Sequence, residues 1–374
     1  MKKEVLQSIA IITGSIIGAG ILGLPFVFMQ AGMWTGLLVL ILLGIATLTV
    51  NLYVGEITLR TKEVHELVGY CQKYLGKHAK ELMTIAMGVG IVGALVAYII
   101  GVGEALGAIF SRDPFLFSVI YFLIMSAIIF YGIKSVSNSE LVLGAIMFIF
   151  MILMLLFSIK HVNTSHLYGF DIWKFFVPYG VILFSLIGAS SIPEARVILM
   201  KNKKDLRKSI IIGSLIPIVF YGLFAVIILG VTGASTTEIA TIGLGNFIGK
   251  HMILLGNLFA VFSMSTSFLA LGLALKWVLK LDYGFSDFTS WGITCITPFI
   301  IFLLGITSFI QAMWLVGSLM GGLEGILLIL TFRAAKKKSE RKPEYSLNYH
   351  GLLGWLLILV YAFGILYTIW SLIF

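Results

Sequence analysis

Residues 14–25 read GSIIGAGILGLP, and residues 185–193 read SLIGASSIP. Each stretch lies inside a long apolar segment, with small residues at its centre and a proline a few positions later. Glycine lowers the stability of a helix by about 1 kcal/mol relative to alanine, and proline lacks the backbone donor that a helix needs. Both stretches therefore predict an apolar helix that is interrupted near its middle.

The chain around these stretches has the composition of a membrane protein. Of its 374 residues, 59% are hydrophobic and 11% are charged, whereas about a quarter of the residues of an ordinary soluble domain are charged. Apolar segments of roughly 20 residues recur along the chain, and a helix of that length crosses about 30 Å of hydrocarbon. Since lipid cannot pair with backbone polar groups, these segments must be helices. The composition excludes a soluble globule and predicts an all-α integral membrane protein.

We expect eleven spans, at residues 5–30, 33–58, 81–110, 114–133, 140–160, 173–199, 208–231, 251–275, 289–306, 309–332 and 350–373. With a cytoplasmic N-terminus, 22 of the 26 Lys and Arg residues fall at the cytoplasmic ends of the spans. The positive-inside rule then predicts a multi-pass protein of the cell membrane with an extracellular C-terminus. The net charge of +9 reflects this topology and does not indicate nucleic-acid binding. Residues 61–80 are polar with apolar positions at helical spacing, which predicts an amphipathic cytoplasmic helix.

The two interrupted segments are the first and the sixth spans. An odd number of crossings separates their starting points, so the two copies run in opposite directions through the membrane. This arrangement predicts an inverted repeat of five plus five helices. Residues 1–160 would form the first repeat and residues 161–332 the second, followed by a cytoplasmic linker at 333–349 and an additional helix at 350–374.

An interruption of this kind can bind a ligand. The free N–H groups at the start of a half-helix favour a carboxylate, and free carbonyl groups favour a cation. A zwitterionic amino acid suits both. The alternative is that the small residues only allow close packing between helices, but two matching interruptions in corresponding spans favour a binding site.

The sequence also resembles a known family. Residues 14–25 resemble the first-helix signature of the amino acid/auxin permease branch of the amino acid, polyamine and organocation superfamily. Residues 190–193 (SSIP) and 266–269 (TSFL) are similar to motifs in helices 6 and 8 of its bacterial aromatic and hydroxy amino acid permeases. The resemblance covers essentially the whole chain. It implies the leucine-transporter-type fold, in which helices 1, 3, 6 and 8 surround a central site that opens alternately to each side.

The resemblance also implies a substrate site made by both interrupted helices. Backbone N–H groups near Ala19 and Gly20 would hold the substrate carboxylate, carbonyl groups of residues 185–188 would receive its ammonium group, and Tyr98 would close over it. The complete expected set is Ile17, Gly18, Ala19, Gly20, Ile21, Tyr98, Ser185, Gly188, Ala189 and Ser190.

Sodium is one expected coupling ion. By resemblance, its oxygen ligands would be the carbonyls of Gly14 and Ile17 and the hydroxyls of Ser263, Thr266 and Ser267. The three hydroxyl residues share one helix face because their spacing is i, i+3, i+4. Such residues also often bond to their own helix. Sodium-coupled members of the branch tend to have asparagine where this chain has Gly14, a departure that weighs against sodium.

The proton is the other expected coupling ion. Glu324 falls near the middle of the tenth span, and a carboxyl group at that depth is costly to ionise unless it has a partner. The alternative is a structural hydrogen bond from Glu324 to a neighbouring helix. The six histidines fall in loops or at span ends, so a histidine relay is not expected. Cys71 and Cys295 lack ligand spacing, and we expect no cofactor and no metal site apart from that for sodium.

These features predict a secondary active transporter that imports a neutral amino acid, aromatic or hydroxy-bearing among the options, with H⁺ or Na⁺ as the coupling ion. We expect the chain to function as a monomer in the lipid bilayer. An uncoupled amino acid exchanger or facilitator is the first alternative, and an ion channel is an alternative of a different class. A channel would show a repeated pore-lining element. An enzyme is not expected, because no cluster of nucleophile, base or metal ligands occurs at membrane depth.

Overall fold

The computed structural model describes residues 2–131, 149–347 and 351–373, and this part of the chain contains helices and no strands. Six long unbroken helices are α3 (Met33–Arg60), α5 (Lys77–Phe110), α6 (Pro114–Tyr131), α10 (Leu206–Thr232), α12 (Lys250–Trp277) and α16 (Gly351–Ile373). A shorter apolar helix is α13 (Asp287–Leu303), and another covers Ile149–His161, whose last turn is the 3₁₀ segment η1 (Ile159–His161). The smaller elements are α4 (Leu67–Leu75), α11 (Ala240–Ile248), the 3₁₀ turns η2 (Thr164–His166), η3 (Ile172–Lys174), η4 (Lys203–Asp205) and η5 (Gly233–Ser235), and the π-helix η6 (Val278–Asp282).

Among the described spans, two are interrupted and a third contains a π-helical segment. The first consists of α1 (Lys3–Ile16) and α2 (Gly20–Ala31), whose axes differ by 53°. The sixth consists of α8 (Tyr179–Leu186) and α9 (Ser191–Ile198). The tenth contains α14 (Phe309–Leu315), the π-helix η7 (Val316–Gly321) and α15 (Gly322–Lys337).

The helices agree with the expected spans. Within the described residues, eight helices are long and apolar enough to cross a bilayer, and the bent pair α1 and α2 makes a ninth span. The two shorter apolar helices correspond to the fifth and ninth spans. Residues 140–148, the start of the expected fifth span, lie outside the described residues. The all-helical membrane fold predicted from composition is confirmed.

The expected amphipathic helix at 61–80 is shorter than predicted. Helix α3 ends at Arg60, and Gly76, with a φ of 97°, separates α4 from α5. A positive φ favours glycine, so the chain turns there and the residues from Lys77 onward belong to the next span. The amphipathic character is present in α4 itself, whose buried residues are Leu67, Val68, Tyr70, Cys71 and Tyr74.

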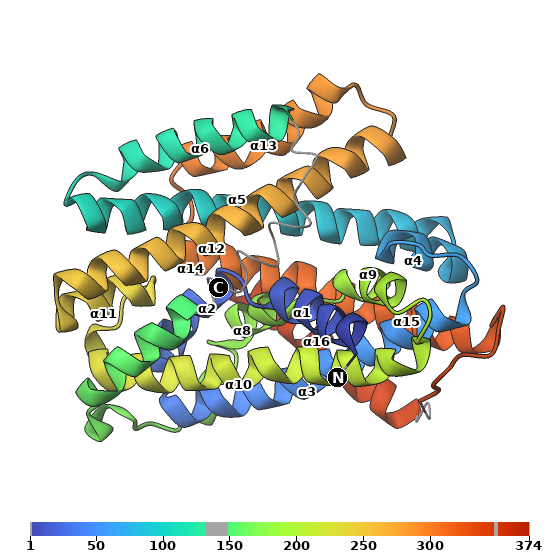
Figure 1. Cartoon of the computed structure of the whole chain (residues 1–374), viewed down its shortest axis with the longest axis horizontal. Coiled ribbons are helices and arrows are strands. Elements are labelled where there is room, and N and C mark those ends of the chain that lie inside the picture. Colours follow the sequence, from blue (N-terminus) through green and yellow to red (C-terminus); the bar gives the residue numbers. More distant parts are fainter. Residues whose placement is uncertain (1, 132–148, 348–350, 374) are drawn as a thin grey trace.

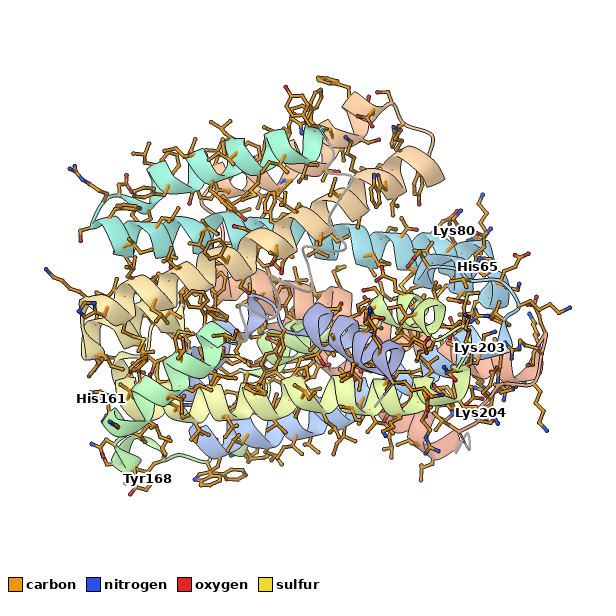
Figure 2. All side chains as sticks on the ribbon, in the orientation of Figure 1. His65, Lys80, His161, Tyr168, Lys203 and Lys204 are labelled. Carbon is orange, nitrogen blue, oxygen red and sulfur yellow. The ribbon has the colours of Figure 1, made fainter. Side chains whose placement is uncertain are left out.

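The helices form two groups, one of which contains the interrupted first and sixth spans (Figure 1). Helices α5, α6, α12 and α13 pack on one another, and so do α3, α10 and the first and sixth spans. Figure 2 shows Lys80, Lys203 and Lys204 at one end of the long helices, which we call the basic end, and His161 and Tyr168 at the opposite end. Large apolar side chains such as Ile45, Leu123 and Phe363 are exposed along the sides, as expected for helices that face lipid.

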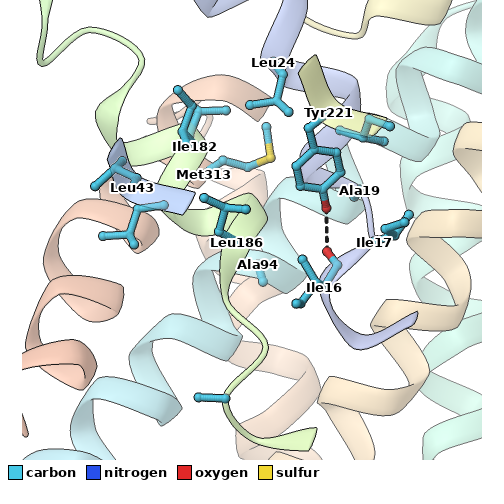
Figure 3. Packing of buried hydrophobic residues seen from close by; sticks show 14 of the residues in the cluster. Ile16, Ile17, Ala19, Leu24, Leu43, Ala94, Ile182, Leu186, Tyr221 and Met313 are labelled. Atoms are coloured by element: carbon cyan, nitrogen blue, oxygen red, sulfur yellow. Dashed lines mark hydrogen bonds between the residues drawn. The ribbon is translucent and has the colours of Figure 1, made fainter. Parts of the chain in front are cut away.

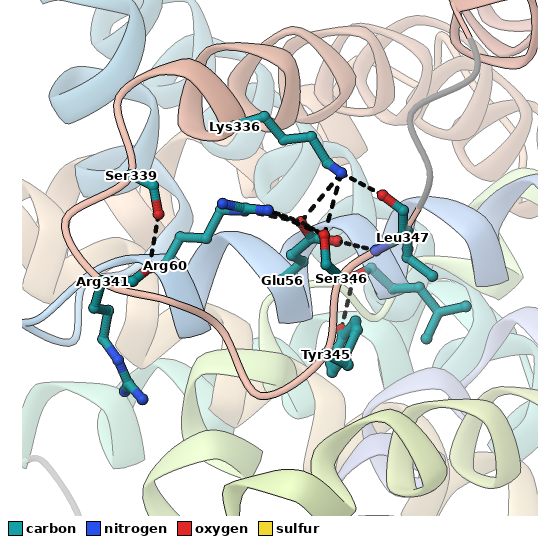
Figure 4. A network of polar contacts seen from close by, with 9 residues as sticks. Glu56, Arg60, Lys336, Ser339, Arg341, Tyr345, Ser346 and Leu347 are labelled. Carbon is teal, nitrogen blue, oxygen red and sulfur yellow. Dashed lines mark hydrogen bonds and ion pairs between the residues drawn. The ribbon is translucent and has the colours of Figure 1, made fainter.

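A polar network at the basic end joins three parts of the chain (Figure 4). The Glu56 side chain is fully buried and lies 2.7 Å from the Arg60 guanidinium and 3.5 Å from the Lys336 ammonium. Its carboxylate also accepts hydrogen bonds from the Ser346 hydroxyl, at 3.2 Å, and from the Leu347 N–H, at 2.6 Å. We call these five residues the Glu56 cluster. It ties the linker after α15 to α3.

A second contact of the same linker is exposed. The Glu340 carboxylate accepts a hydrogen bond from the Lys62 N–H, at 2.9 Å, and lies 2.7 Å from the Lys73 ammonium. These two neighbours hold the pKa of the Glu340 carboxyl group below its ordinary value. The linker is thereby also held against the loop that leads into α4.

Candidate functional site

The first interruption exposes the backbone of three residues in the middle of the protein. Ile17, with a ψ of 98°, ends α1, and Ala19 precedes the first residue of α2. Within the described part of the chain, no group accepts a hydrogen bond from the N–H of Ala19 or Gly20. Because a buried polar group without a partner is costly, these N–H groups are available to a ligand.

The second interruption is similar. Ile187, with a ψ of 124°, ends α8, and Ser190 precedes the first residue of α9. The Gly188 carbonyl accepts a hydrogen bond from the Ser191 hydroxyl at 2.7 Å. No described group pairs with the N–H of Gly188 or Ala189. Both interruptions that the sequence predicts are therefore present, and each presents unpaired N–H groups.

Tyr221 connects the two interruptions. Its buried hydroxyl lies 2.6 Å from the carbonyl oxygen of Ile16 and 3.0 Å from that of Ser185. The backbone of Gly18 also lies close to this hydroxyl. Figure 3 shows the ring of Tyr221 with its hydroxyl directed at the end of α1. The carbonyl groups that end α1 and α8 are thus held by one side chain from α10, a residue that the sequence analysis did not identify.

Two other side chains approach the first interruption from the group formed by α5, α6, α12 and α13. The Tyr98 hydroxyl from α5 lies close to the Ser267 hydroxyl from α12. A Cβ atom at Gly18 would lie 3.3 Å from the Ser267 oxygen. Tyr98, which the sequence analysis expected near the substrate, therefore lies beside the site through Ser267. The side chains of Tyr98, Tyr221 and Ser267 are all uncharged.

The glycines of both interruptions allow the two broken helices to touch. A Cβ atom at Gly20 would lie 2.3 Å from the Ser185 hydroxyl oxygen and 2.7 Å from the Ser185 Cα. A Cβ atom at Gly188 would lie 2.3 Å from a side-chain carbon of Ile16. The close-packing role of small residues, weighed above as an alternative, therefore applies at these two positions. This close packing brings the two interruptions, and with them their free backbone groups, near each other.

The remaining residues of the expected substrate set are placed around these groups. Ile21 is fully buried in α2, Ala189 is buried, and Ser190 is exposed at the start of α9. Among the expected sodium ligands, Ser267 adjoins Gly18, whereas Thr266 donates a hydrogen bond to the carbonyls of its own helix. The Ser263 hydroxyl is buried and has no described partner. Helix α1, which contains Gly14, packs mainly on α9 and α10.

Glu324 lies apart from Tyr98, Ser267 and Tyr221. It is in the first turn of α15 and lines a small cavity bounded by α3, α16 and the second interruption. The structure therefore separates the expected proton-binding residue from the residues at the first interruption.

Two interrupted helices that face each other are characteristic of the leucine-transporter-type fold. The crystal structure of MhsT in complex with L-phenylalanine has the same fold, with a TM-score of 0.72, 14% sequence identity and coverage of 98% of both chains. The sequence profile of the tryptophan/tyrosine permease family matches residues 1–371, and the chain belongs to that family.

Two characterised relatives are amino acid transporters. Glutamine transporter 2 of Aliivibrio fischeri is 23% identical over 290 residues, which is 74% of this chain and 74% of that protein. The tyrosine-specific transport system 1 of Haemophilus influenzae is 27% identical over 296 residues, which is 73% of this chain and 72% of that protein. The chain is thus a multi-pass membrane protein of an amino acid transporter family, and not of an enzyme family.

Proposed function

We propose that this protein is a secondary active transporter that imports a neutral amino acid by alternating access. The observation that supports the proposal most directly is the meeting of the two interruptions at Tyr221, with unpaired backbone N–H groups on both sides. The substrate carboxylate would accept hydrogen bonds from Ala19 and Gly20. Its ammonium group would donate hydrogen bonds to the carbonyl oxygens of Ile16 and Ser185. There it would either displace the Tyr221 hydroxyl or donate beside it.

A neutral substrate agrees with the side chains around the first interruption, since Tyr98, Tyr221, Ser185 and Ser267 carry no charge. A net charge on the substrate side chain would have no opposite charge among them, and burying it would be costly. The family name and the tyrosine-specific relative favour an aromatic substrate, and the glutamine transporter favours a polar neutral one. Both are neutral amino acids, and this is the substrate class that we propose.

We also propose that the basic end faces the cytoplasm and that the protein acts as a monomer in the cell membrane. Lys2, Lys73, Lys80, Lys203 and Lys336 lie in the segments that the positive-inside rule assigns to that side. The N-terminus would then be cytoplasmic and the C-terminus extracellular.

For the coupling ion we favour the proton over sodium. Thr266, one of the expected sodium ligands, bonds to the carbonyls of Phe262 and Ser263 in its own helix, at 3.2 and 3.0 Å. Glu324 faces a cavity without a cationic partner among the described residues. An uncoupled exchanger remains the alternative reading of the same fold.

Uptake into proteoliposomes tests the proposal. We expect labelled neutral amino acids to accumulate inside when an inward proton gradient is imposed, and an inward sodium gradient alone to drive much less uptake. Protein-free liposomes and labelled lysine and glutamate are the controls. Equilibration without accumulation would identify an exchanger or facilitator. An ionic current without amino acid uptake would identify a channel and contradict the proposal.

Tyr221→Phe should lower the rate of transport. The variant keeps the buried ring and removes the hydroxyl that joins the ends of α1 and α8. The carbonyl oxygen that accepts its hydrogen then loses a donor, which costs about 1–3 kcal/mol when the group stays buried. We expect transport to fall by about tenfold, the equivalent of about 1.4 kcal/mol, measured as initial uptake rates over a range of substrate concentrations.

Tyr179→Phe is a matched control. Tyr179 is also buried, and its hydroxyl donates to the backbone carbonyl of Val360, at 3.2 Å, away from both interruptions. We expect its uptake to stay within about twofold of the wild type, as for changes away from a functional site. Equal losses in the two variants would show that Tyr221 has a general packing role.

A further inference from the structure

A small cavity lies next to the second interruption. Its volume is about 30 Å³, and its polar lining consists of Thr47 and Asn51 from α3, Glu324 from α15 and Tyr361 from α16, together with the backbone of residues 187–189. A cavity needs about 10–15 Å³ to hold one water molecule, so this one has room for one or two. Its lining residues are different from Tyr98, Tyr221 and Ser267, which surround the first interruption.

Glu324 is the one acidic residue among those that line this cavity. The described residues form no ion pair or hydrogen bond with its carboxyl group. A carboxylate that is removed from water without a cation is strongly disfavoured. The neutral form is therefore favoured in this arrangement unless the carboxylate gains partners when it ionises.

The other groups that face Glu324 do not supply a cation. Helix α16 contributes the Tyr361 phenol, and α4 contributes the Cys71 thiol, which is hydrogen-bonded to Thr331 at 3.3 Å. Helix α3 contributes the neutral Thr47 and Asn51, and the Asn51 amide donates to Ser214 at 3.2 Å. Residues 187–189 contain no titratable side chain. Arg60 of α3 and Lys336 of α15 are engaged in the Glu56 cluster.

The backbone around Glu324 is shaped to meet the second interruption. The π-helix η7 ends at Gly321, and π-helical turns in α-helices are frequent at functional sites. A Cβ atom at Gly321 would lie 3.1 Å from the Ile187 side chain. One at Gly325 would lie 2.8 Å from the Tyr361 ring. Glycines on both sides of Glu324 therefore let the interrupted helix and α16 approach the carboxyl group closely.

We infer that this cavity is a proton-binding site, next to the second interruption and apart from the first, in which the Glu324 carboxyl group accepts the proton. A hydronium ion in the cavity transfers one proton to the carboxylate and leaves water and a neutral carboxylic acid. On release, the proton returns to water, and the carboxylate accepts hydrogen bonds from the free N–H groups of Gly188 and Ala189. Protonation of Glu324 thereby changes the hydrogen bonding of Gly188 and Ala189 in the second interruption. The proposed substrate ligand of the same interruption is the Ser185 carbonyl. The inference rests on the proposed transport function and identifies where its coupling proton binds.

Glu324→Gln tests the inference, because glutamine keeps the shape of the side chain and cannot take up a proton. We expect proton-driven accumulation in proteoliposomes to fall by at least about tenfold, since the gradient then has no differential effect on the two conformations. We expect substrate affinity to lose its dependence on pH. Counterflow, the exchange of external labelled for internal unlabelled amino acid, should persist, because it needs no net proton release.

Glu104→Gln is the matched control. Glu104 is also an acidic residue within a span, but it lies near the C-terminal end of α5, close to the carboxylate of Glu238. We expect its proton-driven accumulation to stay within about twofold of the wild type.

The outcomes separate the two proposals. Absence of counterflow and of uptake in the wild type, for every neutral amino acid, would overturn the proposed function. Wild-type transport together with full proton-driven accumulation in Glu324→Gln would overturn the proton site alone. Loss of counterflow in Glu324→Gln that Glu324→Asp does not restore would also overturn it, because it would assign a structural role to Glu324.

Discussion

Gly20→Ala should abolish transport, although the protein should still be inserted in the membrane. The added Cβ atom would lie 2.3 Å from the hydroxyl oxygen and 2.7 Å from the Cα of Ser185. Because one of these atoms belongs to the backbone, a change of side-chain rotamer cannot relieve the contact, and the two interrupted helices must move apart. Overpacking of this kind typically costs about 1–3 kcal/mol. The measurement is uptake in proteoliposomes, with the amount of folded protein determined by size-exclusion chromatography in detergent.

Gly88→Ala provides the comparison for this prediction. Gly88 is also within a long helix, but a Cβ atom there would meet its nearest neighbour at 3.9 Å, an ordinary van der Waals distance. We expect this variant to transport normally. In the double variant Gly20→Ala/Ser185→Gly, two of the three close contacts are absent, so activity should recover in part. Normal uptake by Gly20→Ala would contradict the close approach of the two interruptions.

Glu56→Gln should strongly destabilise the folded protein. The substitution keeps the volume of the side chain but leaves Arg60 and Lys336 with a neutral partner, although their side chains are only 12% and 21% exposed. Removal of one partner from a buried ion pair typically costs about 3–5 kcal/mol. We expect a loss near the lower limit, about 3 kcal/mol, because both cations can reach water in part. Thermal unfolding in detergent, followed by the intrinsic fluorescence of the tryptophans, measures the change.

Glu340→Gln provides the contrast at the same linker. Its carboxylate also has two partners, the Lys62 N–H and the Lys73 ammonium, but this contact is exposed to solvent. Exposed ion pairs contribute little to stability, so we expect almost no change in the melting temperature. If both variants unfolded at the wild-type temperature, the Glu56 cluster would not stabilise the fold.

The spans and both interruptions could be predicted from the sequence because each depends on local properties. Hydropathy alone determines a span, since lipid leaves the backbone no alternative to a helix. The interruptions occur at the small residues, at 17–19 and 187–190, and not at the prolines. Pro193 occupies the first turn of α9, where no intrahelical donor is needed, and Pro25 is accommodated within α2.

The side chains that join the interruptions could not be predicted in this way. Tyr221 is 205 residues from Ile16 and 36 residues from Ser185, and one tyrosine in an apolar span gives no local indication of its partners. The same limit applies to the Glu56 cluster, in which Glu56 and Leu347 are 291 residues apart. Such contacts depend on how the helices are rotated and packed, which a single sequence does not reveal.

The Tyr221 contact also has a consequence for the balance of hydrogen-bond donors and acceptors at the site. A phenol has one hydrogen, whereas two carbonyl oxygens, those of Ile16 and Ser185, lie within reach of it. One of these oxygens is therefore always short of a donor, and the phenol cannot correct the deficit by rotating. An ammonium group brings three hydrogens and can satisfy both oxygens at once. A carboxylic acid that lacks the amine would leave the deficit in place, so under the proposed function we expect the site to bind amino acids in preference to simple carboxylic acids.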